Sequence, residues 1–482
     1  ELIIKGFGGH TMKRFLNTFL ILCAVALCIV LIPFGAKANT TADGLQYEIS
    51  EGEVTITGYT GSVTEFVIPE MIEGYPVTSI GDEAFHDCDS LTSITIPDSV
   101  TSIGESAFSD CSSLIHLNIP DSVTSIGDFA FDNCSSLTGV TLPDSVTSIG
   151  DWMFSGCCSL IDINIPDSVT GIGWSAFYGC SSLTNITIPH GVTRIGATAF
   201  YECENLSNIS VPDSIEYVGY EAFPYCANIQ YKAYDNAVYL GNSNNPYVVL
   251  IRCANDSITS CIIHPDAKII HNSAFYDCTN LTSITIPAEI KIIGVGAFDY
   301  CDSLSVCYIA DIAAWCNIYF DVQLGISNPL DMAEFVYVQE ELLTELVIPK
   351  DVTTIKSYVF YGCGSICSIK FNGDAPDIAP SAFYGITATA YYPAGNNTWT
   401  EDVLQDYGGN ITWIPYEAYE PGDLDGVEGV DNRDVEYLLW YTLFPEDYPL
   451  LQRADFDGDG YVDNKDVECL LWHTLFPETY PL

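Results

Sequence analysis

The chain has 482 residues, with 64 Asp and Glu against 15 Lys and Arg, which gives a formal net charge of −49 at pH 7. This acidity argues against nucleic acids and anionic membrane surfaces as partners, because both repel a polyanion. It favours solubility and the binding of cations.

The first 38 residues are expected to be a start region and a removable leader. Met12-Lys13-Arg14 precedes an apolar run over 15–34 and then Ala36-Lys37-Ala38, the basic, hydrophobic and small-residue order of a signal peptide. We expect cleavage after Ala38, and we interpret residues 1–11 as lying before the true start codon. The mature charge would be 11 minus 63, or −52. The alternative is an uncleaved anchor, because the run approaches membrane-spanning length.

Residues 39–80 are expected to form an N-terminal cap and the first coil, with a hairpin over 45–68. A 23-residue repeat then fills 81–387. Its clearest mark is a phenylalanine at a constant step: Phe85, Phe108, Phe131, Phe154, Phe177, Phe200 and Phe223. A period of 20–29 residues with Leu and Ile at set offsets is typical of a leucine-rich-repeat solenoid, whose repeats stack and share one core.

Each repeat contains two extended segments. Leu-x-x-Ile-x-Ile-Pro alternates apolar and polar residues, which predicts a strand that ends at the proline. Ser-Val-Thr-Ser-Ile-Gly predicts a second short extended run, whose glycine suits a turn with positive φ. The consensus resembles the BspA-like leucine-rich-repeat family of bacterial surface proteins over about 45–416. We therefore expect a mainly β solenoid of roughly eleven coils.

Cysteine also follows the repeat. Of nineteen cysteines, seventeen follow the leader, and seven occupy one repeat position: Cys88, Cys111, Cys134, Cys157, Cys180, Cys203 and Cys226. They should form a ladder of small apolar fillers. Because parallel Cβ vectors would strain a bridge between rungs, we expect free buried thiols.

Two inserts and a closing segment interrupt the period. The insert near 235–252 predicts a protruding hairpin around 241–246, and the insert near 306–342 contains a short helix at Asp311–Trp315. Residues 388–416, rich in Tyr and Trp, are expected to close the solenoid, and 417–421 to form a linker.

The outward strand positions form two ladders of mostly small uncharged residues, without aromatic platforms for sugar stacking. One ladder contains Ser93, His116, Gly139, Asp162, Asn185, Asn208 and Ser283, and the other contains Thr95, Asn118, Thr141, Asn164, Thr187, Ser210 and Thr285. This face could bind a protein or a glycan, although a generic solvated face is favoured. The hairpin insert and the aromatic cap are better candidates for a specific contact, unless their rings are buried filler.

No catalytic constellation is found in the sequence. None of the seven histidines forms an HExxH motif or lies near a Gly-x-Ser-x-Gly elbow. Most repeat carboxylates fall at Pro-Asp-Ser turns, where a turn residue is the simple explanation. We therefore predict that the chain is not an enzyme.

Residues 422–482 contain a 32-residue duplication, and each copy opens with an acidic loop. The loops run from Asp423 to Asp434 and from Asp455 to Asp466. Oxygen ligands at this EF-hand-type spacing converge on one hard cation. The predicted Ca²⁺ ligands are Asp423, Asp425, Asp431, Asp434, Asp455, Asp457, Asp459, Tyr461, Asp463 and Asp466.

The duplication resembles a type I dockerin, a calcium-folded module that plugs secreted proteins into cohesin domains. The resemblance implies two Ca²⁺ sites, and the first should be weaker because Val427 and Glu428 replace a ligand and the turn glycine. A short helix should follow each loop, and calcium removal should unfold the module. The resemblance also implies that four residues contact the cohesin: Asn432, Arg433, Asn464 and Lys465. The alternative is that these side chains only solvate the start of each helix.

Together the two resemblances imply a monomeric, secreted or cell-surface protein without catalytic activity. Its solenoid would serve adhesion or substrate capture, and its dockerin-like domain would attach it to a cohesin-bearing, cellulosome-like scaffold. One alternative is a hydrolase or accessory component of polysaccharide degradation, because dockerins commonly carry such enzymes. A second alternative is a structural spacer.

Overall fold

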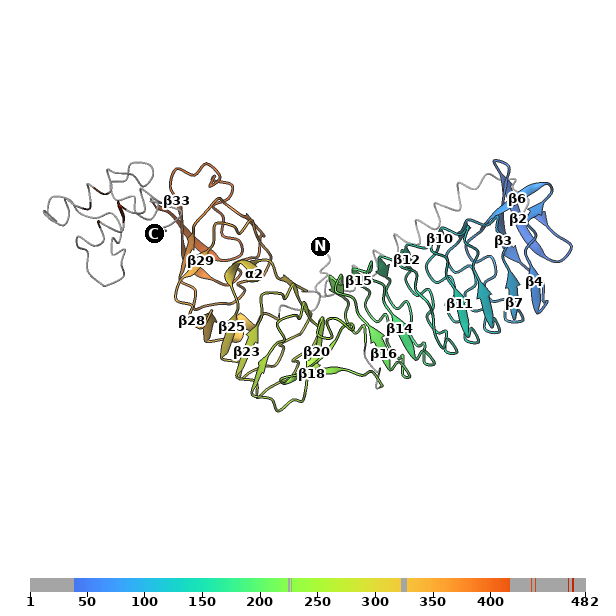
Figure 1. The fold of residues 1–482 in the computed structure, drawn as a ribbon. Helices are drawn as coiled ribbons and strands as arrows, with labels where there is room; N and C mark the ends of the chain where they lie inside the picture. Colours follow the sequence, from blue (N-terminus) through green and yellow to red (C-terminus); the bar gives the residue numbers. More distant parts are fainter. Residues whose placement is uncertain are drawn as a thin grey trace, which may run out of the picture. The chain divides into compact units, whose positions relative to one another are not determined.

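The computed structural model describes residues 39–223, 226, 228–321 and 327–416, together with Val435, Leu438, Val467, Leu470 and Leu471. These residues divide between two compact units that meet in sequence at Gln230 and Tyr231, and each unit is described by itself. Figure 1 shows the coils of the units as successive turns with short strands. The described residues form a mainly β leucine-rich-repeat solenoid of about 15 turns. The expected eleven coils were too few, because segments interpreted as caps and inserts form turns of their own.

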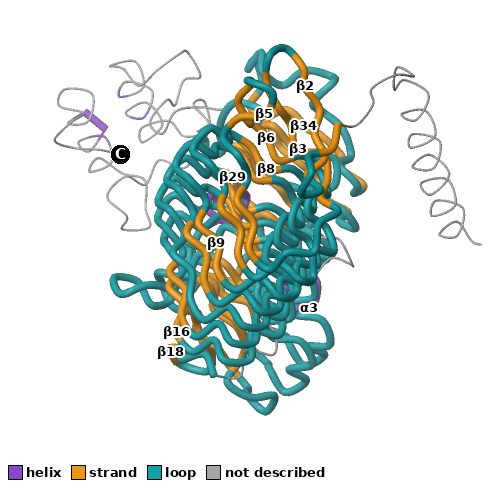
Figure 2. The backbone as a smooth tube through the Cα atoms, turned by 90° about the vertical axis from the view of Figure 1, so that its right-hand side faces the viewer, coloured by secondary structure: helices purple, strands orange, loops and turns teal. Residues whose placement is uncertain are grey.

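One parallel sheet system of the first unit carries the predicted Leu-x-x-Ile-x-Ile strands, three residues to a strand. These strands are β4 (Glu65–Val67), β7 (Ser93–Thr95), β9 (His116–Asn118), β11 (Gly139–Thr141), β14 (Asn185–Thr187) and β16 (Asn208–Ser210). Residues 162–164 join β11 to β14 through the bridges Thr141–Asn164 and Asp162–Asn185. Figure 2 shows such strands side by side in successive turns. We call the solvent side of this system the strand face.

The second predicted extended run is also confirmed. Its strands are β8 (Ser102–Ile103), β10 (Ser125–Ile126), β12 (Ser148–Ile149), β13 (Gly171–Ile172), β15 (Arg194–Ile195) and β17 (Tyr217–Val218). They pair in parallel with a step of 23 residues. The N-terminal hairpin is confirmed as antiparallel β2 (Leu45–Ser50) and β3 (Glu53–Tyr59). Strands β1 (Asn39–Thr40), β5 (Met71–Ile72) and β6 (Tyr75–Ile80) complete this end.

The second unit repeats the same plan with irregular spacing. Its largest sheet contains β18 (Lys232–Tyr234), β19 (Ala237–Leu240), β20 (Val249–Cys253), β22 (Ile269–Ile270), β24 (Ile292–Ile293) and β26 (Tyr319–Phe320). Its strand face contains β21 (Ser260–Ile262), β23 (Ser283–Ile286), β25 (Val306–Ile309), β27 (Phe335–Val338) and β28 (Glu341–Leu342). The closing turns contain β29 (Leu346–Ile348), β30 (Thr354–Ile355), β31 (Ser368–Phe371), β32 (Asp377–Ile378), β33 (Thr387–Pro393) and β34 (Asn410–Tyr416).

Both inserts have the predicted local structure. Strands β19 and β20 form an antiparallel hairpin whose connection contains residues 241–246. The second insert contains helix α2 (Ile312–Cys316), which begins directly after Asp311 because the carboxylate of this N-cap residue accepts a hydrogen bond from the Ala314 nitrogen. Trp315 of α2 is buried, and its indole nitrogen donates to the Val359 carbonyl oxygen, 2.7 Å away. Helix α3 (Pro329–Met332) follows in the same insert.

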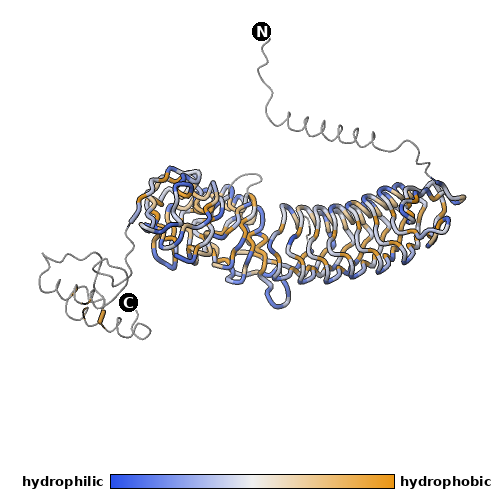
Figure 3. The backbone as a smooth tube through the Cα atoms, turned by 90° about the horizontal axis from the view of Figure 1, so that it is seen from above, coloured by the Kyte–Doolittle hydropathy of each residue, from blue (hydrophilic) through white to orange (hydrophobic). Residues whose placement is uncertain are grey.

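The repeat phenylalanines form a continuous stack through the core of the first unit. Phe85 and Phe108 are fully buried, with ring centroids 5.2 Å apart and planes 8° apart, and the stack continues to Phe223. Figure 3 shows hydrophobic and hydrophilic segments alternating along the coils, as one shared core requires. Each inner coil thus buries its apolar side against both neighbouring coils, as Phe108 does against Phe85 and Phe131.

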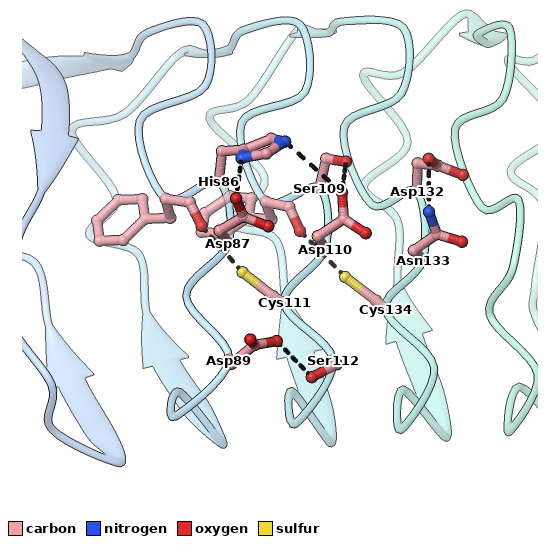
Figure 4. A network of polar contacts seen from close by, with 12 residues as sticks. His86, Asp87, Asp89, Ser109, Asp110, Cys111, Ser112, Asp132, Asn133 and Cys134 are labelled. Atoms are coloured by element: carbon pink, nitrogen blue, oxygen red, sulfur yellow. Dashed lines mark hydrogen bonds and ion pairs between the residues drawn. The ribbon is translucent and has the colours of Figure 1, made fainter.

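The cysteine ladder has a second role besides filling space. The Cys111 thiol donates to the Phe85 carbonyl oxygen at 3.1 Å, and Cys134 donates to that of Phe108 at 3.2 Å (Figure 4). The same bond recurs for Cys157, Cys180, Cys203 and Cys226. All sixteen cysteines of the described part of the chain are free. Free buried thiols were predicted for the seven of the ladder, and six of these are buried while Cys88 is half-buried.

The predicted role of the repeat glycine was wrong. Gly104, Gly127 and their equivalents do not have positive φ. Instead, a Cβ on Gly127 would lie 2.5 Å from the Glu105 backbone nitrogen of the preceding coil. Glycine is therefore required by close coil packing. Positive φ occurs two residues later, at residues such as Ser106 and Phe129.

The predicted leader and the predicted calcium loops lie outside the described residues. Within the described part of the chain, every helix is too short or too polar to cross a membrane. Val435, Leu438, Val467, Leu470 and Leu471 are helical, and Leu438 and Leu470 are fully buried.

Candidate recognition surface

The strand face of the first unit presents the two predicted ladders to solvent. In β9, His116 and Asn118 are exposed, while Leu117 between them is 3% exposed. The alternation follows from the strand repeat of two residues, which sends neighbouring side chains to opposite sides. Parallel pairing in register then aligns Gly139 with His116 and Thr141 with Asn118.

A shallow groove of about 640 Å³ lies on this face. Its lining is formed by the strand segments 116–118, 139–141, 162–164 and 185–187. Gly139 has no side chain between His116 of the coil before and Asp162 of the coil after. The hollow therefore forms where one ladder loses a side chain.

The groove offers hydrogen-bonding groups and little charge. The His116 Nδ1 and Thr138 Oγ1 atoms share a hydrogen bond of 3.1 Å, and the Asn208 Nδ2 atom donates to Asn185 Oδ1 at 2.7 Å. Asp162 supplies one carboxylate to the lining. This arrangement can bind a neutral polar ligand through amides and hydroxyls.

The strand face of the second unit differs from the sequence-based description, because it does contain aromatic side chains. Pairing aligns Thr285, Tyr308 and Tyr337. The two tyrosine rings lie 5.0 Å apart with planes 23° apart, and they line a groove of about 600 Å³. Phe335 of the same strand is 41% exposed.

The sequence contained a signal for this tyrosine pair, but the insert hid it. Tyr308 follows Thr285 by the regular 23 residues, whereas Tyr337 follows Tyr308 by 29. A search at constant period therefore reaches Tyr308 but misses Tyr337. Counting apolar alternation on both sides of α2 would have found the pair.

The hairpin insert and the closing segment were favoured from sequence as sites of a specific contact, but most of their aromatic side chains are used in packing. In the hairpin insert, Tyr239 is fully buried and Tyr247 stacks on His264 with centroids 3.7 Å apart. In the closing segment, Trp399 is 7% exposed and packs on Phe371 at 4.8 Å. These rings mainly fill the core. Buried filler was the alternative interpretation of the aromatic residues in both segments.

A polar row lies along the turns that follow the repeat phenylalanines (Figure 4). The His86 Nδ1 atom lies 3.2 Å from Asp87 Oδ2, and its Nε2 atom lies 3.6 Å from Asp110 Oδ2. These three side chains are close enough to one another to hold a metal ion. Further along, Asn133 Nδ2 donates to Asp132 Oδ2 at 3.1 Å, and burial raises the pKa of Asp132.

The ten predicted calcium ligands, from Asp423 to Asp466, lie outside the described residues, as do the four predicted cohesin contacts Asn432, Arg433, Asn464 and Lys465. They stay predictions. The described strand-face residues of the two ladders lie where the repeat predicted them.

Comparison with known proteins identifies the repeat. The family model described as "BspA type Leucine rich repeat region" matches residues 58–181, 111–230, 252–320 and 332–399. No curated protein matches the chain significantly.

Solved structures include similar proteins. A leucine rich cell surface protein from Faecalibacterium prausnitzii A2-165 is 30% identical, with 77% of this chain and 97% of that chain covered and a TM-score of 0.36. A leucine-rich repeat protein from Bacteroides ovatus is 24% identical, with 78% and 100% covered and a TM-score of 0.38. Because the family model matches more than half of the chain, the chain belongs to the BspA-type leucine-rich-repeat family.

Proposed function

We propose that the chain is a non-catalytic recognition protein whose strand face binds a protein or glycan ligand outside the cell. The observation that supports this proposal most directly is the polar groove around Gly139. A regular ladder covers the face with side chains, and the groove interrupts it next to His116 and Asp162. Such a hollow can accept a ligand group that a flat face cannot.

The character of the face favours recognition over catalysis. Amide and hydroxyl groups predominate on the strands of the first unit, and a stacked tyrosine pair replaces them in the second. These groups fix the orientation of a ligand through hydrogen bonds and ring contacts. A name given to one relative, a leucine rich cell surface protein, agrees with an extracellular role.

The proposal includes a tether at the C-terminus. The duplicated loops at 423–434 and 455–466 would bind Ca²⁺, fold the dockerin-like domain and attach the chain to a cohesin of a scaffold protein. The solenoid would then be cargo held at a surface by a noncovalent plug. Support for this part comes from the sequence duplication and its ligand spacing.

The groove is tested by two matched glycine substitutions. An added Cβ meets no atom within 4 Å at Gly139 in the groove or at Gly171 in the second sheet. Gly139→Gln and Gly171→Gln should therefore both fold, which thermal unfolding checks. Wild-type protein and both variants are screened on arrays of glycans and extracellular matrix proteins. Ligands lost by Gly139→Gln and kept by Gly171→Gln support the proposal, whereas an array without such a ligand contradicts it.

The tether and the enzymatic alternative have separate readouts. Binding of the full chain to immobilised type I cohesins should occur in Ca²⁺ and disappear in excess EDTA. Release of reducing sugar from plant polysaccharides by the purified chain would instead favour a hydrolase.

A further inference from the structure

Two cysteine sulfurs meet in the second unit, where the hairpin insert joins the regular repeat. The Cys278 thiol donates a hydrogen bond to the Cys253 sulfur, and the two Sγ atoms lie 3.1 Å apart. Cys253 ends β20, and Cys278 lies in the turn after Phe275. Both thiols are free, with Cys253 7% exposed and Cys278 fully buried. The pair is therefore a dithiol whose sulfurs are already in contact.

Cys253 occupies the place that phenylalanine holds in the regular coils. Its backbone nitrogen donates to the Ala274 carbonyl oxygen at 2.7 Å, and the Phe275 nitrogen donates in the same way to an alanine of the next coil. In the regular coils the ladder thiol donates to the carbonyl oxygen of a preceding phenylalanine, as Cys301 does to Phe275 at 3.1 Å. Cys278 meets a cysteine side chain at this place, so its thiol bonds to sulfur instead.

The two sulfurs also differ in geometry from neighbours in the cysteine ladder. Ladder neighbours share one register position, so their Cβ vectors are parallel and a bridge between them would be strained. Cys253 and Cys278 come from different register positions, and this obstacle does not apply to them. Cys88 also hydrogen-bonds a second thiol, that of Cys111. Both of those residues belong to the ladder, however, and Cys111 already donates to the Phe85 carbonyl oxygen. Of these two pairs, Cys253 and Cys278 are the better placed to bridge.

The two thiols of the pair are not equally reactive. The hydrogen bond from Cys278 lowers the pKa of Cys253, and the same bond raises the pKa of Cys278. Residues 254–257, directly after Cys253, are exposed, whereas Cys278 is fully buried. Because the thiolate is the nucleophile in disulfide exchange, Cys253 is the attacking sulfur and Cys278 the resolving one.

We propose that Cys253 and Cys278 form a redox-controlled disulfide, which closes by exchange with a low-molecular-weight disulfide. Cys253 loses its proton and attacks one sulfur of the reagent, which forms a mixed disulfide and releases one thiolate. Cys278 then loses its proton and attacks the Cys253 sulfur, which forms the internal bond and releases the second thiolate. The two released thiolates take up the two protons. Two protein thiols are thereby oxidised, and one reagent disulfide is reduced to two thiols.

The bond would enclose residues 253–278 in a covalent loop. This segment contains β21 and β22, and β21 is the edge strand of the second unit's strand face. Closing such a loop restricts the unfolded chain and so stabilises the folded one. Oxidation would therefore fix the start of this face, and reduction would release it. The inference does not depend on the proposed function, because no ligand takes part.

Tryptic peptide mapping tests the bond in the full chain. Reduced protein is treated with hydroxyethyl disulfide, a neutral reagent that the acidic chain does not repel, and is then alkylated and digested without reductant. Trypsin cuts after Arg252, Lys268 and Lys291, so the two cysteines fall on the separate peptides 253–268 and 269–291. We expect these two peptides to be joined, and reductant should separate them.

Alanine variants identify the sulfurs, because peptide 253–268 also contains the buried Cys261. Cys261→Ala is the matched control and should keep the joined peptides, whereas Cys253→Ala should lose them. Cys278→Ala should trap Cys253 as a mixed disulfide with the reagent, which shows that Cys253 is attacked first.

A stability measurement on the wild-type chain needs no variant to fold. Oxidation should raise its melting temperature by about 5 °C or more, and reductant should reverse the rise. Alkylation of both cysteines after treatment of the folded chain would overturn the proposal, as would joined peptides that persist in Cys253→Ala. An unchanged melting temperature in the oxidised chain would contradict the stabilising role of the bond.

Discussion

The Cys134 thiol donates a hydrogen bond to the carbonyl oxygen of Phe108, 3.2 Å away in the preceding coil. The carbonyl also accepts from the Cys111 nitrogen, so one oxygen joins two coils. The repeat cysteine thus fills space beside the phenylalanine stack and links neighbouring turns. A residue of similar size without a hydrogen-bond donor would fill the space but would not link the turns.

Replacing Cys134 by Ala should lower the free energy of unfolding by about 1–2 kcal/mol. The variant loses a buried hydrogen bond and leaves a small cavity. Cys158→Ala is the control, because Cys158 is exposed and should change stability by less than about 0.5 kcal/mol. Denaturant unfolding measures both, and equal effects would mean that the ladder contributes nothing specific.

The same ladder predicts a loss of stability at alkaline pH. Burial raises the pKa of Cys134 to about 12 from an ordinary value of 9.0. Above pH 9 the unfolded thiol releases its proton while the folded thiol keeps it, so folded protein binds more protons and stability falls with rising pH. The contribution is complete below pH 9 and is lost between pH 9 and 12.

Comparison with the Cys134→Ala variant isolates the loss of folding stability that this thiol causes at alkaline pH. Each such thiol contributes a slope of at most about 1.4 kcal/mol per pH unit in this window. The difference in unfolding free energy between wild type and variant should therefore shrink above pH 9 and reverse sign before pH 12, where the variant becomes the more stable protein. A difference that stays constant would show that the thiol titrates alike in both states.

Gly127→Ala should destabilise the first unit by about 2 kcal/mol or more, because its Cβ would lie 2.5 Å from the Glu105 nitrogen. Gly171→Ala in β13 meets no atom within 4 Å and should cost about 1 kcal/mol or less. Thermal unfolding of the two variants checks the difference. A tolerated alanine at Gly127 would contradict the explanation from coil packing.

The repeat made most of the fold predictable from sequence. A constant step between Phe85 and Phe223 predicts the stacked core, and alternation around Leu117 predicts which side chains face solvent. The role of Gly104 could not be predicted, because one repeat does not reveal how closely the next coil approaches. Irregular spacing likewise concealed the alignment of Tyr308 with Tyr337.

The candidate sites were harder to predict than the scaffold. The strand-face groove forms where a ladder loses a side chain, at Gly139. A missing side chain carries no chemical signature, and only the register of neighbouring coils shows that it leaves a groove. Aromatic content led to the opposite error. It favoured the hairpin insert and the closing segment as contact sites, although Tyr239 and Trp399 are buried filler.

The two calcium loops should differ in affinity. Asp459→Ala removes a ligand from the second loop, whose spacing is complete, and should abolish the tighter Ca²⁺ site. Asp425→Ala in the first loop should affect only the weaker site, because Val427 already replaces a ligand there. Calorimetric Ca²⁺ titration of the full chain distinguishes them. Equal affinities in the wild-type loops would contradict the prediction.

The central claim is that the strand face is a ligand-binding surface. Hydrogen–deuterium exchange of the full chain with and without its best array ligand measures this most directly. We predict protection of segments 116–118, 139–141 and 162–164, with little change at the turns near 152–158. Protection confined to those turns or to other segments, with the strand segments unchanged, would contradict the claim.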